Sequence, residues 1–197
     1  MAMNHEEDHI VDALCNIAKQ MDIKCVIQIG AQDGYECLAV CKATGARGIA
    51  IEGNSECVPC SPELEWHRLV IGDANRQTIF YVHPDPALSG LLPRGHKDER
   101  AITVKQQSLD TFCEENSLGP DMLIVDTEGT TLEVLDGADN ILDSVRLIYA
   151  ECQTKEIRPG VSLLYKVDAF LTDRGFRQHQ GLPSYEVEVQ GNYTWVK

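Results

Sequence analysis

The spacing of apolar side chains changes several times along the chain, and each change predicts a new element. Ile10, Leu14 and Ile17 recur at helical intervals. Residues 1–22 are therefore expected to form an amphipathic N-terminal helix that covers the sheet. Four continuous apolar runs follow, of the kind that forms strands buried on both faces of a parallel sheet. These runs are residues 24–30, 48–52, 120–129 and 145–152.

Turn and cap signals predict the elements between these strands. Helices are expected at residues 35–43, 108–116, 131–138 and 161–174. Ser108 or Asp110 is expected to cap the second of these helices. Thr130 and Glu133 have the spacing of a capping box at the start of the third. Further strands are predicted at residues 68–75, 78–82, 101–107, 176–180 and 193–197, the last two as an antiparallel pair.

The alternation of strands and helices predicts an α/β fold with a Rossmann-like domain over residues 23–197. Its sheet is expected to be open and mostly parallel, with helices on both faces and an antiparallel hairpin at the C-terminus. Ligands of such sheets bind beyond the carboxyl ends of the strands. Residues 83–100, rich in proline and glycine and without periodicity, predict a long loop that covers a site or is mobile.

Composition narrows the class of partner. The net charge of -14, with no cluster of lysine or arginine, disfavours nucleic acid and anionic membranes and favours a small neutral or cationic ligand. The acidic start and the lack of a long apolar run predict a cytoplasmic protein. Its eight cysteines are then expected to stay reduced and pack as small apolar groups. Cys57 and Cys60 have the spacing of half a zinc site, but no second pair completes it.

A glycine loop after the first buried strand is the first candidate binding motif. Gly30 and Gly34 let the backbone turn sharply and approach a ligand closely. Glu52 follows 18 residues after Gly34, close to the spacing at which a carboxylate binds the hydroxyls of a ribose. Asp33 in the loop would repel a pyrophosphate but attract a sulfonium and an amino group, as in S-adenosylmethionine. The alternative is that Asp33 only caps the following helix.

Two blocks of the chain resemble the FkbM-type S-adenosylmethionine-dependent methyltransferases. The first is "VIQIGAQDG" with "AIEGN", and it is common to many Rossmann-like enzymes. The second is the more distinctive run "SLDTFCEEN", "PDMLIVDTEGTTLEVLDGADNIL" and "VRLIYAEC". The resemblance spans about residues 24–178.

The resemblance implies a class I methyltransferase fold, with a seven-stranded sheet whose last strand is antiparallel, and usually O-methylation of a hydroxyl on a sugar or natural product. It also implies a role for each matching residue. Gly30, Ala31, Gln32, Asp33 and Gly34 would line the methionine part of the cofactor, Glu52 the ribose, Asp73 and Ala74 the adenine, and Asp126 and Glu128 the transferring methyl group. The chain departs from the family in being short and in having Gln32 where asparagine is frequent.

The expected chemistry is an in-line methyl transfer assisted by a base. The cofactor carries the reactive group, and a hydroxyl acceptor must also lose its proton. Asp126, Glu128 and Glu151 are the candidate bases, because like charges at a strand end raise a carboxyl pKa. His83 in the long loop is a weaker candidate.

Alternatives remain open for these carboxylates and for the protein. Asp126, Glu128 and Glu151 could instead hold Mg²⁺, which is less favoured, and Glu128 could only interact with helix amides. The rivals to a methyltransferase are a nucleotide-dependent oxidoreductase and a cofactor-binding protein without activity. The expected partner is a small-molecule acceptor, and the oligomeric state stays open.

Overall fold

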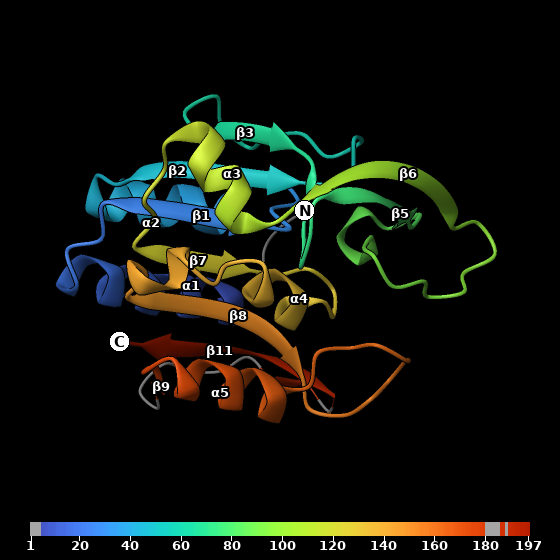
Figure 1. Cartoon of the computed structure of the whole chain (residues 1–197). Coiled ribbons are helices and arrows are strands. Elements are labelled where there is room, and N and C mark those ends of the chain that lie inside the picture. The colour runs from blue at the N-terminus through green and yellow to red at the C-terminus, as the bar shows by residue number, and fades with distance from the viewer. Residues whose placement is uncertain (1–4, 180–185, 188) are drawn as a thin grey trace.

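A computed structural model gives the fold and describes residues 5–179, 186–187 and 189–197 (Figure 1). Its helices are α1 (His5–Gln20), α2 (Tyr35–Thr44), α3 (Leu109–Asn116), α4 (Thr131–Asp136) and α5 (Leu164–Asp173), with the 3-10 turns η1 (Pro86–Leu88) and η2 (Ile141–Asp143). Its strands are β1 (Cys25–Ile29), β2 (Arg47–Glu52), β3 (Glu65–Arg68), β4 (Val70–Ile71), β5 (Arg76–Val82), β6 (Arg100–Gln107), β7 (Met122–Val125), β8 (Leu147–Gln153), β9 (Arg177–Gln178), β10 (Glu186–Val187) and β11 (Gln190–Val196).

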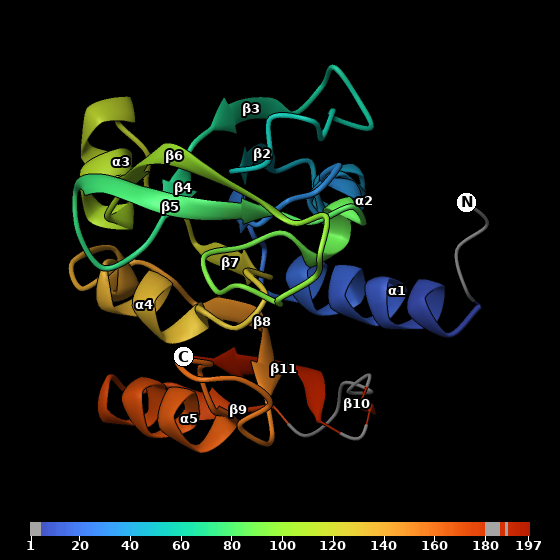
Figure 2. The same ribbon diagram turned by 90° about the vertical axis from the view of Figure 1, so that its right-hand side faces the viewer.

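The main sheet has the strand order β10-β11-β8-β7-β1-β2-β3, and β9 also pairs with β11. The five strands from β8 to β3 are parallel, and β11 runs antiparallel to β8. Helices α1 and α2 cover one face of this sheet, and α3, α4 and α5 cover the other (Figures 1 and 2). The prediction of a mostly parallel sheet with helices on both faces and antiparallel C-terminal strands is confirmed.

Two apolar layers hold the sheet between its helices. On one face, Leu14 of α1 and Val40 of α2 pack against Val26 of β1. On the other face, Phe112 of α3 and Leu171 of α5 belong to a larger core. This core also contains the side chains that the same strands direct to that face. Both faces of β1 and β7 are thus buried, which explains why these strands read as continuous apolar runs.

A separate small sheet, in the order β4-β6-β5, lies beyond the carboxyl ends of the parallel strands (Figure 1). The prediction of one strand over residues 68–75 is wrong, because the chain there leaves the main sheet at β3 and enters the small sheet at β4. Strand β3 was missed because its side chains are only partly buried at the sheet edge, so they show no apolar run. The strand predicted over residues 101–107 is confirmed as β6. Its expected place at a sheet edge is wrong, because β6 lies between β4 and β5 in the small sheet.

Of the predicted helix caps, the one at α3 is confirmed and the one at α4 is wrong. Ser108 caps α3, because its hydroxyl accepts a hydrogen bond from the amide of Thr111 at 3.2 Å, whereas Asp110 instead accepts from the amide of Ile141. The predicted capping box at α4 is wrong, since Thr130 makes no side-chain cap bond and Glu133 accepts from the hydroxyl of Ser162.

The C-terminal elements also differ slightly from the pattern. Helix α5 begins at Leu164 rather than at residue 161, because Leu163 is an extended cap residue and residues 161–162 have no regular structure. The predicted antiparallel pair is confirmed where Arg177 and Gln178 pair with Val196 and Trp195, and residue 180 lies outside the described residues.

Two further features concern the cysteines and membrane association. The eight cysteine thiols are free in the structure, and four of them are buried, whereas Cys60 is exposed. Among the described residues, no helix combines the length and the apolar character that crossing a membrane requires.

The first prediction concerns α1, which shares the core of the sheet. Leu14→Ala removes a fully buried side chain, so we expect the free energy of unfolding to fall by about 2–5 kcal/mol. Asn16→Ala on the exposed side of α1 is the matched control and should change it by less than about 0.5 kcal/mol. Chemical denaturation measures both, and equal effects would show that α1 does not dock on the sheet.

Candidate active site

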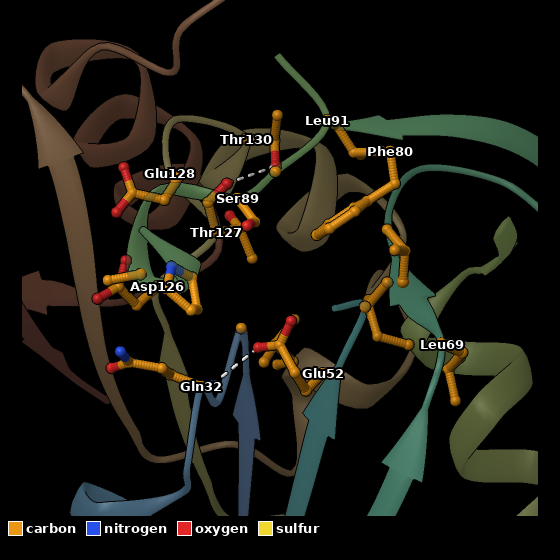
Figure 3. A pocket seen from close by; sticks show the side chains of 18 residues that line it. Gln32, Glu52, Leu69, Phe80, Ser89, Leu91, Asp126, Thr127, Glu128 and Thr130 are labelled. Atoms are coloured by element: carbon orange, nitrogen blue, oxygen red, sulfur yellow. Dashed lines mark hydrogen bonds between the residues drawn. The ribbon is translucent and has the colours of Figure 1, made fainter. Parts of the chain in front are cut away.

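A pocket lies where the parallel strands end and the small sheet begins (Figure 3). One wall is acidic, with Asp126 and Glu128, and the facing wall carries Phe80 and Leu91, while Glu52 lies between them. The lining residues are Ile29, Gly30, Gln32, Glu52, Gly53, Leu69, Val70, Ile71, Phe80, Pro86, Ala87, Ser89, Gly90, Leu91, Asp126, Thr127, Glu128 and Thr130.

Gly30 brings the ends of β1 and β7 together at the base of the pocket. Its φ is +73°, and a Cβ on it would lie 1.7 Å from the carbonyl oxygen of Asp126. The amide of Asp126 donates to the carbonyl of Ile29 at 2.9 Å, so the two segments touch through their backbones. Because only glycine fits this contact, Gly30 is required for the position of Asp126.

Glu52 is a buried carboxylate oriented by backbone amides. Its Oε2 accepts from the amide of Gln32 at 2.8 Å, and its Oε1 accepts from the amide of Asn54 at 2.6 Å. Burial raises its pKa, and these hydrogen bonds oppose that shift. A carboxylate oxygen has a second lone pair, so Glu52 can still accept hydrogen bonds from two ligand hydroxyls.

Three carboxyl groups converge at the ends of β7 and β8. Asp126, Glu128 and Glu151 each place an oxygen within 4.8 Å of the other two. Glu128 has a φ of +56°, a left-handed conformation that costs free energy for a residue with a side chain. The fold holds this turn nevertheless, so the position of the Glu128 carboxylate is maintained against local strain.

The pKa values of this cluster are shifted upward. Although Asp126 opens onto the pocket, the surrounding protein displaces water and raises its pKa well above the ordinary value, and the charges of Glu151 and Glu128 add to this. Burial also raises the pKa of Glu151, opposed by its hydrogen bond with Asp126. Such a pair shares one proton, with Asp126 as the donor. Burial and the charge of Glu151 raise the pKa of Glu128 to about 7, opposed by Arg94.

The loop over residues 83–99 closes one side of the pocket through Arg94. Its guanidinium donates to the carboxylate of Glu128 and, through Nε, to the carbonyl of Leu88 at 3.1 Å. The carboxylate of Glu99 accepts from the amide of Arg94 at 3.0 Å. Residues 86–87 and 89–91 of the loop line the pocket, so of the two predicted possibilities the structure favours a covering loop.

Several residues expected in the glycine loop do not reach the pocket. Ala31 is buried in the core beneath it, and Gly34 precedes α2 at a point where a Cβ would lie 2.6 Å from a methyl carbon of Leu64. The exposed carboxylate of Asp33 accepts from the amide of Tyr35 at 3.0 Å, which is the helix-start contact of the alternative interpretation. The negative charge at the pocket therefore comes from Glu52 and the three-carboxyl cluster rather than from Asp33.

Asp73 and Ala74 also lie outside the pocket lining. Asp73 forms an ion pair with Arg76 at 2.7 Å, and this ion pair lowers the pKa of Asp73. The side-chain amide of Gln106 donates both to Asp73 and to the carbonyl of Ala74. The structure instead brings Leu69 and Val70 to the pocket at this point of the chain. The predicted roles of Asp73 and Ala74 toward adenine stay predictions.

His83 is bound within its own loop. Its Nδ1 accepts from the amide of Asp85 at 3.0 Å, and its ring packs edge-on against His96 with 4.9 Å between centroids. It is not among the residues that line the pocket, so the structure does not bring it to the three-carboxyl cluster.

Some residues that line the pocket or contact its lining were not predicted from the sequence. Phe80 belongs to a predicted strand, but the pattern did not show that this strand leaves the main sheet. Arg94 and Leu91 lie in a segment without periodicity, which carries no signal of their position. An arginine in a loop expected to cover an acidic site was the one available signal.

Comparisons with known structures show a shared fold. The structure resembles precorrin-6y C5,15-methyltransferase from Geobacter metallireducens GS-15, with a TM-score of 0.51 and 14% identity over 94% of this chain and 87% of that one. It also resembles magnesium protoporphyrin IX methyltransferase from Synechocystis PCC 6803, solved with bound SAM, with a TM-score of 0.51 and 10% identity over 100% of this chain and 86% of that one. A third is cofactor-bound Rv0187 from MTB, with a TM-score of 0.53 and 12% identity over 100% and 81%.

These neighbours place the fold among the class I methyltransferases, as the resemblance implied. No curated protein matches the chain. The methyltransferase FkbM domain matches residues 28–178, which is most of the chain and includes both the glycine loop and the three-carboxyl cluster. This match favours a methyltransferase over an oxidoreductase or a protein without activity. The chain therefore belongs to the FkbM methyltransferase family and is an S-adenosylmethionine-dependent methyltransferase.

Proposed function

We propose that this enzyme transfers the methyl group of S-adenosylmethionine to a hydroxyl oxygen of a small acceptor, a sugar-containing molecule or a natural product. The observation that carries the proposal is the convergence of Asp126, Glu128 and Glu151 within 4.8 Å at one end of the pocket. A hydroxyl has a high pKa and needs a base as its oxygen forms the new bond, and carboxyl groups of raised pKa suit that task.

The residues of the pocket fit this cofactor. Glu52 keeps free lone pairs on both oxygens for the hydroxyls of a ribose, because its other lone pairs are held by backbone amides. Phe80 and Leu91 offer an apolar wall for a purine, and the acidic wall opposite suits a positively charged sulfonium. When bound, the cofactor supplies an electrophilic methyl group.

The chain's own residues then perform positioning and proton removal. Asp126 is the proposed base, because it is the most exposed residue of the cluster and lines the pocket, whereas the carboxylate of Glu128 is bound by Arg94. Glu151 is buried beside it and accepts the hydrogen bond of the shared proton. A shift of that proton onto Glu151 frees Asp126 to take up the proton of the acceptor, and the pair then carries no charge. Arg94 ties the covering loop to Glu128 and so excludes water from this end of the pocket.

The same carboxylates could bind Mg²⁺. The charges around them favour a role as a general base over a role as metal ligands. Arg94 contacts the carboxylate of Glu128, and Arg158 donates to the backbone carbonyl of Glu128. Two guanidinium groups already supply positive charge next to the cluster, which disfavours a further cation. The net charge of -14 supports a small neutral acceptor, and we propose that the enzyme works in the cytoplasm.

Methyl transfer to a panel of small molecules tests the proposal. The protein is incubated with methyl-labelled S-adenosylmethionine and sets of alcohols, phenols, amines and carboxylic acids, and NMR identifies the labelled product. A labelled methoxy group is the expected product. Labelled N-methyl or methyl ester products without any methoxy product would reject O-methylation while leaving the enzyme a methyltransferase.

The next prediction concerns the binding of the demethylated cofactor. Glu52→Gln should weaken the binding of S-adenosylhomocysteine by about 10- to 100-fold, because it loses charged hydrogen bonds to the ribose. Isothermal titration calorimetry measures the affinity. Glu63→Gln is the matched control, since Glu63 is exposed and lies outside the pocket lining, and it should bind as the wild type does.

Removal of the proposed base separates chemistry from binding. Asp126→Asn should lower kcat by about 10²- to 10⁴-fold, because the side chain no longer accepts the proton of the acceptor. The affinity for S-adenosylhomocysteine should change little, since the side chain keeps its size. A variant with wild-type turnover would exclude Asp126 as the base.

The shifted pKa of Glu128 predicts a pH-dependent stability of the protein without ligands. Its ordinary value of 4.5 is raised to about 7, so the folded state retains a proton that the unfolded state releases. The free energy of unfolding should therefore fall as pH rises from about 4.5 to about 7. In Glu128→Gln this contribution, about 3 kcal/mol at most, should be absent. Denaturation at pH 4.5 and pH 8 measures it, and parallel profiles in both proteins would contradict the shift.

A further inference from the structure

Gln153, the last residue of β8, is buried without a hydrogen-bond partner for its side chain. Its exposed fraction is 0%, and neither Nε2 nor Oε1 finds a partner among the described residues. An amide buried in this way costs about 1–3 kcal/mol of folding free energy. A structural role does not explain the residue, because an apolar side chain of the same size would avoid this cost.

Other polar atoms without partners lie beside Gln153. Around Gly129, the position that a Cβ would take is 3.5 Å from Gln153 Oε1 and 3.5 Å from a terminal nitrogen of Arg158. The Nε of Arg158 has no partner among the described residues, and neither has Oε2 of Glu151. Unpaired donors and acceptors thus gather at the ends of β7 and β8.

This group of atoms is continuous with the three-carboxyl cluster. Glu151 and Gln153 are two residues apart on one strand, so their side chains point to the same face, with about 7 Å between their positions. Glu151 forms a hydrogen bond with Asp126, the proposed base. The unpaired amide therefore lies on the same face of β8 as the carboxyl group that shares a proton with the proposed base.

We propose that Gln153 and Arg158 form an acceptor subsite, which binds a second polar group of a polyhydroxylated ring whose nearer hydroxyl is methylated. The proposal rests on the proposed function. The amide of Gln153 both donates and accepts, and the Nε of Arg158 donates, which matches a hydroxyl group better than a carboxylate because Glu128 and Glu151 are close. Gln153 and Arg158 are thus specificity-determining residues.

The segment after β8 controls access to this subsite. Arg158 donates to the carbonyl of Glu128, and Val161 packs within 3.0 Å of the Cβ position of Gly129, which encloses Gln153. Residues 154–160 are exposed or half-buried, with Ile157 42% exposed, so the buried Val161 is the main apolar contact that holds this segment. Binding of a ring next to Gln153 requires residues 154–161 to move outward.

The test measures ring binding to the full chain saturated with S-adenosylhomocysteine. The probes are myo-inositol, a cyclic polyol, and cyclohexanol, a ring with one hydroxyl, and saturation-transfer NMR detects binding. The wild type should bind myo-inositol more tightly than cyclohexanol. Gln153→Met should weaken myo-inositol binding about tenfold or more, through the loss of about two hydrogen bonds, and leave cyclohexanol unaffected.

Thermal stability without ligands gives an independent readout. Because methionine removes the unpaired amide at nearly equal volume, Gln153→Met should raise Tm by about 2–4 °C. Thr194→Val is the matched control: Thr194 is also buried with an unpartnered hydroxyl but lies on β11, outside the pocket lining. It should raise Tm and leave myo-inositol binding unchanged. If Gln153→Met does not fold, Arg158→Lys, which keeps the charge but loses the unpaired Nε, should weaken the same binding.

The outcomes separate this proposal from the proposed function. If the wild type does not bind S-adenosylhomocysteine, the proposed function fails. If it does, but wild type and Gln153→Met respond equally to myo-inositol, or neither responds, the acceptor subsite is overturned and the proposed function stands. A lower Tm for Gln153→Met than for the wild type, with the control behaving as expected, would also overturn it, since the amide would then be paired.

Discussion

Repulsion among Asp126, Glu128 and Glu151 is the constraint on which the rest of the site depends. Three carboxyl groups this close cannot all be charged in a pocket of reduced polarity. A proton shared by Asp126 and Glu151 relieves part of the repulsion, and Arg94 relieves another part at Glu128. Because Arg94 comes from the covering loop, the electrostatics of the base also position the loop that shields it from water.

The backbone around this cluster is also constrained, by a close contact at Gly30 and by a strained conformation at Glu128. Gly30 admits the carbonyl of Asp126 at a distance that no side chain would allow, and Glu128 adopts a left-handed conformation. Strain of this kind persists where the surrounding structure holds it, and it concentrates at functional sites. Together with the unpaired amide of Gln153, it indicates that this end of the sheet gives up stability for its chemistry.

Local patterns predicted the elements whose neighbours are apolar on both faces. Strands β1, β2, β7 and β8 and helices α2 and α3 follow from the sequence, because each buries continuous or periodic apolar side chains. The placement of β3, β5 and β6 did not, since an edge strand and a strand of a second sheet have the same alternating pattern. The predicted capping box of Thr130 and Glu133 fails for a similar reason. The hydroxyl of Ser162, distant in sequence, donates to the carboxylate of Glu133.

The sequence by itself determined the fold class, the family and the carboxylates at the strand ends, because these depend on residue type and spacing along one segment. It named Asp126, Glu128 and Glu151 as neighbours, since parallel strands end at the same edge of a sheet. Only the tertiary structure decided that Asp33 and Asp73 lie outside the pocket lining and that Arg94 and Gln153 lie beside the cluster. Those positions depend on how loops fold back over the sheet, and contacts between distant segments leave no periodic signal in the chain.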